Sequence, residues 1–172
     1  MALTLVSLIA VPVFAAPGGK VNDSSQNLYL YPKEPPPNPT DPEWIPVLDG
    51  AWGKFNYRID GQIVSGVFNG HGLVAVTDYT LISYNDPWGA DPAFVVIGND
   101  IADKNGNVHI AAKSVDLGLD VASPIYDWNG AEDGYKIWLV LTDDIDAQTS
   151  MFTGWNYASY LFENNRIGAT GP

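Results

Sequence analysis

Six Asn-Gly or Asp-Gly dipeptides follow residue 48 and divide the rest of the chain into short segments. No other feature of the sequence restricts the fold so strongly. Asn, Asp and Gly accept the positive φ angles that tight hairpin turns require, so each dipeptide predicts a turn between two strands. The predicted turns are Asp49-Gly50, Asp60-Gly61, Asn69-Gly70, Asn105-Gly106, Asn129-Gly130 and Asp133-Gly134.

Apolar and polar residues alternate between the predicted turns, which is the pattern of a strand with one buried face. In segment 54–60, for example, Phe55, Tyr57 and Ile59 alternate with polar residues. The same alternation occurs in segments 62–68, 78–85, 93–98, 107–115, 135–142 and 156–163. No segment keeps a helical period for three turns, and only a short helical turn is expected near 144–151. We therefore predict an all-β domain over 49–172, a single antiparallel β-sandwich of jelly-roll or Ig-like type with seven to nine strands.

Residues 1–16 form an apolar segment without a charged side chain. The run from Leu3 to Phe14, and Val13-Phe14-Ala15 with small or branched residues at −3 and −1 of a cleavage site, resemble a secretory signal peptide, although the basic start of such a peptide is missing. A membrane-spanning helix takes about 20 apolar residues, so we expect no stable membrane span. We expect an extracellular or cell-surface protein that is exported through this signal peptide.

A second hypothesis keeps residues 1–16 in the mature protein as an extended N-terminal arm. Such an arm can add as a strand to the open sheet of a neighbouring subunit, with alternate side chains filling pockets. Head-to-tail donation does not close on itself, so it would build a homo-oligomeric filament. This predicts a non-enzymatic structural protein. The side chains expected to fill the pockets are Leu3, Leu5, Ile9, Val11 and Val13.

Residues 17–48 are predicted to be a proline-rich spacer. Seven prolines lie between Pro32 and Pro46, a density that favours an extended, semi-rigid chain. Segment 27–31 alternates like a short strand and is expected to be an edge strand. Asn22 begins a glycosylation sequon, Asn22-Asp-Ser24, which is a weak indication on its own.

The charge and the cysteine content exclude several classes of function. Twenty acidic residues against eight basic ones leave a net charge of −12, which disfavours nucleic acid and anionic membranes as partners. The absence of cysteine excludes disulfides, thiol catalysis and zinc–thiolate sites. A chain of this charge is suited to binding divalent cations, or to remaining soluble.

Two groups of acidic residues are candidates for a calcium site. Asp143, Asp144 and Asp146 follow the predicted strand 135–142 and could bind a hard cation at the edge of the sandwich. A second group, Asp100, Asp103, Asn105 and Asn107, resembles the oxygen-rich start of a calcium loop, but Gly106 stands at the fourth position, counted from Asp103, instead of the sixth. The alternative is that such Asp side chains cap their own backbone turns. We expect no other cofactor.

Three tryptophans lie in polar loops and are candidates for stacking on a sugar: Trp88, Trp128 and Trp155. Aromatic faces beside Asp and Asn fit a glycan, because sugar C–H faces stack on rings while carboxylates and amides bond the hydroxyls. The alternative is that these rings plug the ends of the sandwich. The two histidines, His71 and His109, are expected to be unrelated turn and surface residues. No catalytic motif is present, so we expect no enzyme, with a secreted glycoside hydrolase as the residual hypothesis.

Seven short strings of the sequence form a distinctive set: Gly50-Ala-Trp-Gly-Lys54, Phe68-Asn-Gly-His-Gly-Leu73, Asp78-Tyr-Thr-Leu-Ile82, Gly106-Asn-Val-His-Ile110, Ser114-Val-Asp-Leu-Gly118, Lys136-Ile-Trp-Leu-Val140 and Tyr160-Leu-Phe-Glu163. Together they resemble a group of uncharacterised exported proteins from archaea and bacteria, over about Asn27 to Ile167. The group has no assigned activity, so the resemblance implies export and a β fold only. The layout of arm, spacer and β domain is also similar to fibre-forming surface subunits joined by donor strands. A secreted, monomeric carbohydrate-binding or calcium-binding module is the alternative function.

Overall fold

The computed structural model describes residues 25–38, 44–84, 92–118, 135–165 and 167. The described chain consists of strands with two short 3₁₀ helices, so the predicted all-β class is confirmed. No helix in this part of the chain is long and apolar enough to cross a membrane. The strands are β1 (Gln26–Tyr31), β2 (Lys33–Glu34), β3 (Ile45–Pro46), β4 (Trp52–Asp60), β5 (Ile63–His71), β6 (Asp78–Tyr84), β7 (Phe94–Ile101), β8 (Val108–Asp116), β9 (Lys136–Leu141), β10 (Ile145–Asp146), β11 (Met151–Phe152) and β12 (Leu161–Glu163), and the 3₁₀ helices are η1 (Thr142–Asp144) and η2 (Tyr157–Ser159).

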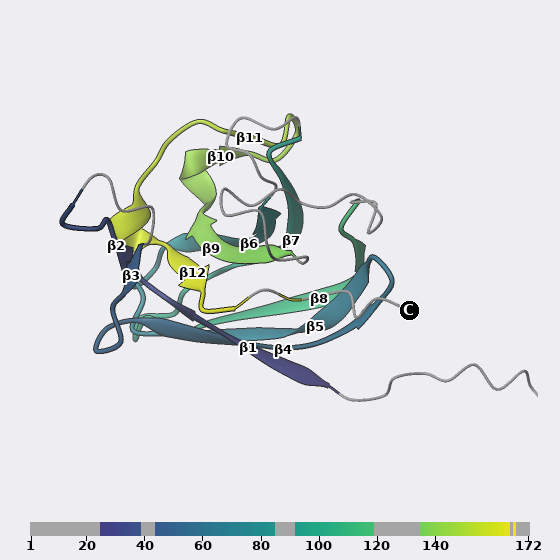
Figure 1. Ribbon diagram of the computed structural model, residues 1–172, viewed down its shortest axis with the longest axis horizontal. Coiled ribbons are helices and arrows are strands. Elements are labelled where there is room, and N and C mark those ends of the chain that lie inside the picture. Colours follow the sequence, from purple (N-terminus) through teal and green to yellow (C-terminus); the bar gives the residue numbers. More distant parts are fainter. Residues whose placement is uncertain (1–24, 39–43, 85–91, 119–134, 166, 168–172) are drawn as a thin grey trace, which may run out of the picture.

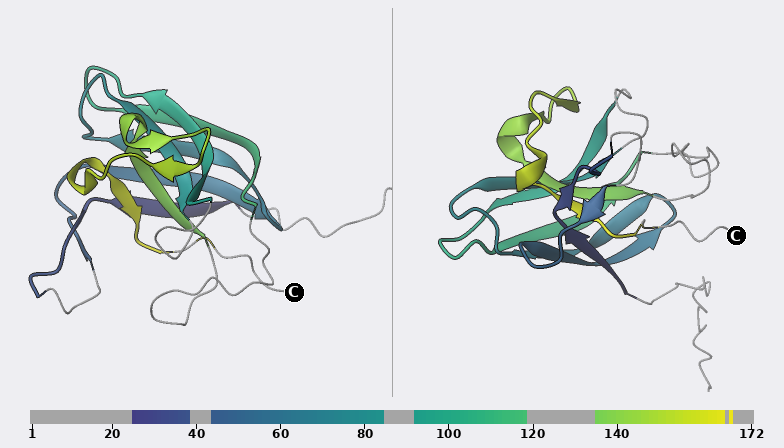
Figure 2. Two further views of the ribbon diagram at one scale, coloured as in Figure 1. Left: turned by 90° about the horizontal axis from the view of Figure 1, so that it is seen from above. Right: turned by 60° about the vertical axis from the view of Figure 1, so that its left-hand side comes forward.

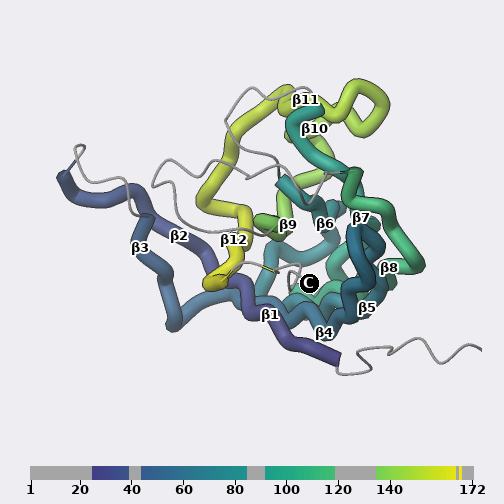
Figure 3. The backbone as a smooth tube through the Cα atoms, turned by 45° about the vertical axis from the view of Figure 1, so that its right-hand side comes forward, coloured from purple at the N-terminus to yellow at the C-terminus, as the bar shows by residue number. Residues whose placement is uncertain are grey.

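Eight strands form one antiparallel sheet in the order β7-β6-β9-β12-β1-β4-β5-β8. The sheet curls until its end strands, β7 and β8, lie beside each other, so that the strands follow one another round a ring (Figure 3). The approach of β7 to β8 is close because Gly98 has no side chain: a Cβ there would lie 2.8 Å from Cγ2 of Ile110. The ring is flattened into two layers, with β1, β4, β5 and β8 below and β6, β7, β9 and β12 above (Figure 1). The two layers are therefore parts of one continuous sheet.

Alternate side chains from all eight strands fill the space between the two layers. Burial of one Leu, Ile or Phe side chain contributes about 1.5–3 kcal/mol, so this core is the main support of a chain without disulfides. Its largest fully buried side chains are Phe55, Phe68, Tyr79, Tyr135, Leu30, Leu81, Ile110, Leu117 and Ile137.

Strand β1 lies in the middle of the sheet, between β12 and β4, and not at an edge as its position before the prolines predicts. The physical reason is that Leu28 and Leu30 both point into the core, where neither is more than 3% exposed. A strand that buries two leucines gains more from two neighbouring strands than from one. Strand β1 is therefore an inner strand of the sheet, and the described part of the proline-rich segment, with β2 and β3, lies between β1 and β4 in the chain.

The predicted turns have different outcomes. Gly61 (φ +58°) and Gly106 (φ +76°) occupy the tight turns between β4 and β5 and between β7 and β8, as predicted. Asn69-Gly70, in contrast, lies inside β5. Gly70 is needed there for space and not for a turn, because a Cβ would lie 2.9 Å from both Leu73 Cδ1 and Val108 Cγ1. Asn129-Gly130 and Asp133-Gly134 lie outside the described residues.

The segment from Thr142 to Tyr160 packs on the outer side of β6, β9 and β12 (Figures 1 and 2). It contains η1, the β10–β11 hairpin and η2, in place of the helical turn expected near 144–151 and of most of the strand expected at 156–163. This segment encloses a second, mostly aromatic core on the outer side of the sheet. Its buried members are Ile82, Tyr84, Ala93, Phe94, Trp138, Val140, Tyr160 and Phe162.

Candidate functional site

The lower layer of the sheet consists of β1, β4, β5 and β8 (Figure 1). Its outer side carries aromatic and amide side chains that the described chain leaves partly or fully exposed. Strand register arranges them in rows across the strands. Tyr29 pairs with Lys54, Lys54 with Asn69, and Asn69 with His109. The next row contains the pair Trp52–His71. We call this surface the polar–aromatic face, and its members are Tyr29, Tyr31, Trp52, Lys54, Asn69, His71, Asn107 and His109.

The aromatic rings of this face adjoin one another. Tyr29 and Tyr31 stack with centroids 6.5 Å apart and planes inclined by 13°, and Tyr29 lies 6.5 Å from Trp52. Tyr29 is 37% exposed and Trp52 is 38% exposed, so these rings remain accessible. The Lys54 ammonium lies 5.8 Å from the centre of Tyr29, within cation–π range. The rings form an accessible platform with a cation beside it.

Two Asn-x-His strings run antiparallel to each other across β5 and β8. Nδ1 of His71 lies 2.9 Å from Oδ1 of Asn107, and Nδ1 of His109 lies 2.8 Å from Oδ1 of Asn69. Each string therefore orients the histidine of the other. The expectation that the two histidines are unrelated is wrong, because cross-strand register places them in adjacent rows of one face.

A chain of hydrogen bonds determines how His71 is protonated when it is neutral. Nδ2 of Asn107 donates to the Asp103 carboxylate, at 3.3 and 3.2 Å from its two oxygens. A carboxylate only accepts, so the amide oxygen of Asn107 must face the ring and His71 Nδ1–H must donate to it. His71 Nε2 then carries the lone pair. The ring also lies 4.6 Å from Trp52, between centroids, so its plane is held from two sides.

Asp103 acts in this network as a backbone cap. Its Oδ1 accepts the backbone N–H groups of Asn105 and Asn107 at 2.8 and 2.9 Å. These hydrogen bonds, above all those from Asn107, hold the pKa of Asp103 below its usual value. In the oxygen-rich segment predicted as the start of a calcium loop, Asp103 thus caps a turn that supports the polar–aromatic face.

Two carboxylates of the other predicted calcium site also accept local hydrogen bonds, and calcium binding at both places stays a prediction. Asp144 Oδ2 accepts the Tyr160 hydroxyl at 2.6 Å, and Asp146 Oδ1 accepts the backbone N–H of Gln148 at 2.9 Å. Burial and the Asp144 hydrogen bond raise the pKa of Tyr160 far above its usual value. Asp143 is exposed on η1. Within the described ranges, no three Asp, Glu or His side chains are grouped closely enough to hold a metal ion.

Of the tryptophans predicted to bind sugar, Trp88 and Trp128 lie outside the described residues, and Trp155 lies beside the rings of the second core. Trp155 is 42% exposed, but other rings surround it edge to face: Tyr160 at 5.4 Å, Phe152 at 6.1 Å and Trp44 at 6.5 Å between centroids. Sugar stacking on Trp155 therefore stays a prediction. A second group of accessible rings lies on strands, where the pairing of β1 with β4 brings Tyr29 to Trp52.

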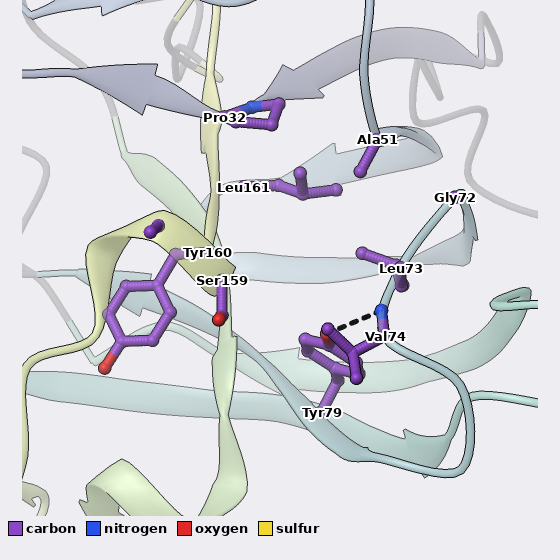
Figure 4. Close-up of a pocket in the computed structure, with 10 residues that line it drawn as sticks. Pro32, Ala51, Gly72, Leu73, Val74, Tyr79, Ser159, Tyr160 and Leu161 are labelled. Carbon is purple, nitrogen blue, oxygen red and sulfur yellow. Dashed lines mark hydrogen bonds between the residues drawn. The ribbon is translucent and has the colours of Figure 1, made fainter.

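A small pocket lies at the end of the curled sheet where β4 and β12 begin (Figure 4). Its lining includes Leu73, Leu161 and Tyr79, whose hydroxyl accepts the backbone N–H of Val74 at 3.2 Å. The volume is about 80 Å³, whereas ligand pockets usually measure about 300–1,000 Å³. This pocket is too small for a sugar.

The predicted assembly arm, with Leu3, Leu5, Ile9, Val11 and Val13, lies outside the described residues, as does Asn22. Strand donation, export and glycosylation therefore stay predictions. Comparison of the chain with protein-family models, with curated proteins and with solved structures finds no match. The resemblance to exported proteins also stays a prediction, and function has to be argued from the polar–aromatic face.

Proposed function

We propose that this protein is a non-catalytic module that binds a polysaccharide on the polar–aromatic face. The observation that carries the proposal is the platform of adjoining exposed rings, Tyr29, Tyr31 and Trp52, beside side chains that form hydrogen bonds. The C–H faces of sugar rings stack on aromatic rings, while amides, imidazoles and ammonium groups bond the hydroxyls.

The form of this surface favours a polymer over a free small sugar. Strands present a broad face, and successive outward residues of one strand lie about 6.8 Å apart. Each sugar unit on such a surface makes only shallow contact, so useful affinity requires several contacts along one chain to add. The rings and amides extend over three neighbouring strands, β1, β4 and β5, which supplies this repetition.

The hydrogen-bond network behind the face supports the proposal. His71 is held by Asn107 and Trp52, and Asn107 is in turn held by Asp103. Side chains fixed before binding lose less conformational entropy when a ligand arrives. With its Nδ1–H engaged, neutral His71 offers Nε2 as an acceptor to a sugar hydroxyl.

Binding to soluble polysaccharides tests the proposal, with hydroxyethylcellulose, glucomannan, methyl-esterified pectin and polygalacturonate as probes in affinity electrophoresis and calorimetry. Trp52→Ala and Tyr29→Ala are expected to weaken binding at least about tenfold, the effect of losing roughly 1.4 kcal/mol. Trp155→Ala is the matched control, because its ring is exposed to a similar extent as Trp52 but packs edge to face in the second core.

The control also separates two locations for the site. If Trp155→Ala abolishes binding in a folded protein while Trp52→Ala has no effect, the site lies in the loops that the sequence predicted. If no probe binds, the proposal is wrong. The hydrolase hypothesis predicts instead that the wild-type protein releases reducing ends from one of the four probes.

A further inference from the structure

We propose that the polysaccharide bound by the polar–aromatic face is acidic, with carboxylate groups along the chain. This inference rests on the proposed function and names the class of polymer. The observation behind it is the distribution of charge on β1, β4, β5 and β8. This distribution opposes the composition of the whole chain, in which 20 acidic residues stand against 8 basic ones.

The charged side chains that point outward from these four strands are basic, with two exceptions. The exceptions are the last residue of β4 and the last residue of β8, which are both acidic. The basic side chains are Lys54 and Arg58 on β4 and Lys113 on β8. The two carboxylates, Asp60 and Asp116, stand at the far end of the face, where β5 lies between them and pairs with both through Ile63. If charges were placed on this face in the proportion of the whole chain, acidic side chains would predominate.

The basic side chains lie where a polymer on the aromatic platform would meet them. Lys54 stands in the same row as Tyr29, with its ammonium 5.8 Å from the ring centre. A carboxylate on a sugar beside Tyr29 can therefore pair with Lys54. Arg58 lies four residues further along β4, about 13–14 Å away at 3.4 Å per residue. A chain that carries charges at intervals and lies along β4 meets both cations.

The row that contains Arg58 continues through Ser65 to the edge of the face. Ser65 pairs with Arg58, and the Ser65 hydroxyl accepts the backbone N–H of Ser114 at 3.1 Å. This bond anchors the irregular turn of backbone at Ser114 (φ +52°), next to Lys113. The Lys113 side chain is exposed on the same side of the sheet as His109. The cations thus continue from β4 to β8.

Single-stranded nucleic acid is the competing polyanion, because it also stacks on aromatic rings within a basic groove. The amide groups of Asn27, Asn56 and Asn69 favour the polysaccharide. Amides bond sugar hydroxyls well, whereas three cations on a strongly acidic protein are few for a phosphate backbone.

Polygalacturonate and methyl-esterified pectin provide a matched pair of probes, because esterification removes the charge and keeps the galacturonate backbone. Wild-type protein is expected to bind polygalacturonate at least about fivefold more tightly, and added NaCl is expected to reduce this difference. Lys113→Gln is expected to weaken binding to polygalacturonate about two- to fivefold and to leave binding to the ester unchanged. Lys54→Gln is expected to weaken binding to polygalacturonate by a larger factor than binding to the ester, because Lys54 also belongs to the aromatic platform.

Lys136→Gln is the control, since it removes the same charge from β9 in the opposite layer. Lys54→Gln can also weaken binding indirectly, because Lys54 contacts the Tyr29 ring. Lys113→Gln tests the effect of charge without that contact. Equal binding of both probes, abolished by Trp52→Ala, would overturn the acidic ligand and leave the proposed function intact. Absence of binding to all the polysaccharides overturns both proposals. Tighter binding of an oligo(dT) strand than of polygalacturonate overturns the acidic polysaccharide in favour of nucleic acid.

Discussion

His71 and Asn107 are joined by a 2.9 Å hydrogen bond that connects the last residue of β5 to the residue before β8. Because Asn107 is itself held by Asp103, this single contact sets both the tautomer and the plane of the His71 ring. The turn between β7 and β8 thus controls a side chain on the polar–aromatic face.

Asn107→Ala is expected to release His71 without removing it. The ring should then populate both neutral tautomers, and polysaccharide binding should weaken about two- to fivefold, the cost of one lost orienting bond. Nitrogen chemical shifts of His71 measure the tautomer directly. Asn69→Ala is the matched control, because Asn69 bonds His109 instead. An unchanged His71 tautomer in Asn107→Ala would refute the role assigned to Asn107.

Gly53→Ala is expected to destabilise the protein by about 1–3 kcal/mol, because a new Cβ would overlap the buried Phe68 ring. Gly50→Ala, three residues earlier, is the control: nothing lies within 4 Å of a Cβ built there. Urea unfolding of the two variants measures the difference. Equal midpoints for the two variants would mean that the core shifts to accept the methyl group.

Asp103 is expected to make the stability of the protein depend on pH in the acidic range. Its pKa is lowered by hydrogen bonds from Asn107 and Asn105, so its stabilisation is complete above the unfolded-state pKa of about 4. This stabilisation is lost as the pH falls through the lower folded-state pKa. Unfolding free energies of wild type and Asp103→Asn should therefore converge toward about pH 2. A constant difference from pH 6 to pH 2 would contradict this.

Tyr160 is expected to make the stability of the protein depend on pH in the alkaline range. Its raised pKa means that the unfolded chain loses the phenolic proton above about pH 10 while the folded protein keeps it. Above about pH 10, the unfolding free energy of the wild type should therefore fall faster with rising pH than that of Tyr160→Phe. The difference between the two slopes should be about 1.4 kcal/mol per pH unit. At pH 7 the variant should lose about 1–3 kcal/mol, because Asp144 and the Asn156 N–H lose a buried partner. Tyr157→Phe, which keeps the ring against Trp44, is the control.

Strand donation predicts that protein lacking residues 1–16 forms no filaments while its domain still folds. Electron microscopy of the truncated and full-length proteins measures this, with circular dichroism as the check on folding. Leu5→Arg and Ile9→Arg should have the same effect in the full-length chain, since a charge cannot enter an apolar pocket. Filaments of normal repeat without the arm would end this hypothesis.

The local part of the fold could be predicted from sequence, because its signals lie within a few residues. The alternation of Phe55, Tyr57 and Ile59 predicts strand β4, and Asp60-Gly61 predicts the turn that follows. The turn predicted at Asn69-Gly70 is wrong because Gly70 is required there for space inside the sheet. The sequence does not distinguish such a glycine from one that a turn requires.

The candidate site could not be predicted in the same way, because it depends on strand pairs that are distant in sequence. Tyr29 and Trp52 look like isolated aromatic residues until β1 pairs with β4. Trp155 has polar neighbours in sequence and looks accessible, yet Trp44 and Tyr160 pack against it from elsewhere in the chain. Neighbours along the chain do not reveal which face of a ring remains exposed.

The pairing of Leu30 with Glu163 has a consequence for how the protein is made. Strand β1 is synthesised before every other strand of the described sheet, whereas one of its two partners, β12, is synthesised after all of them. The ring of strands therefore cannot close until β12 has left the ribosome. Such long-range pairing makes folding slow.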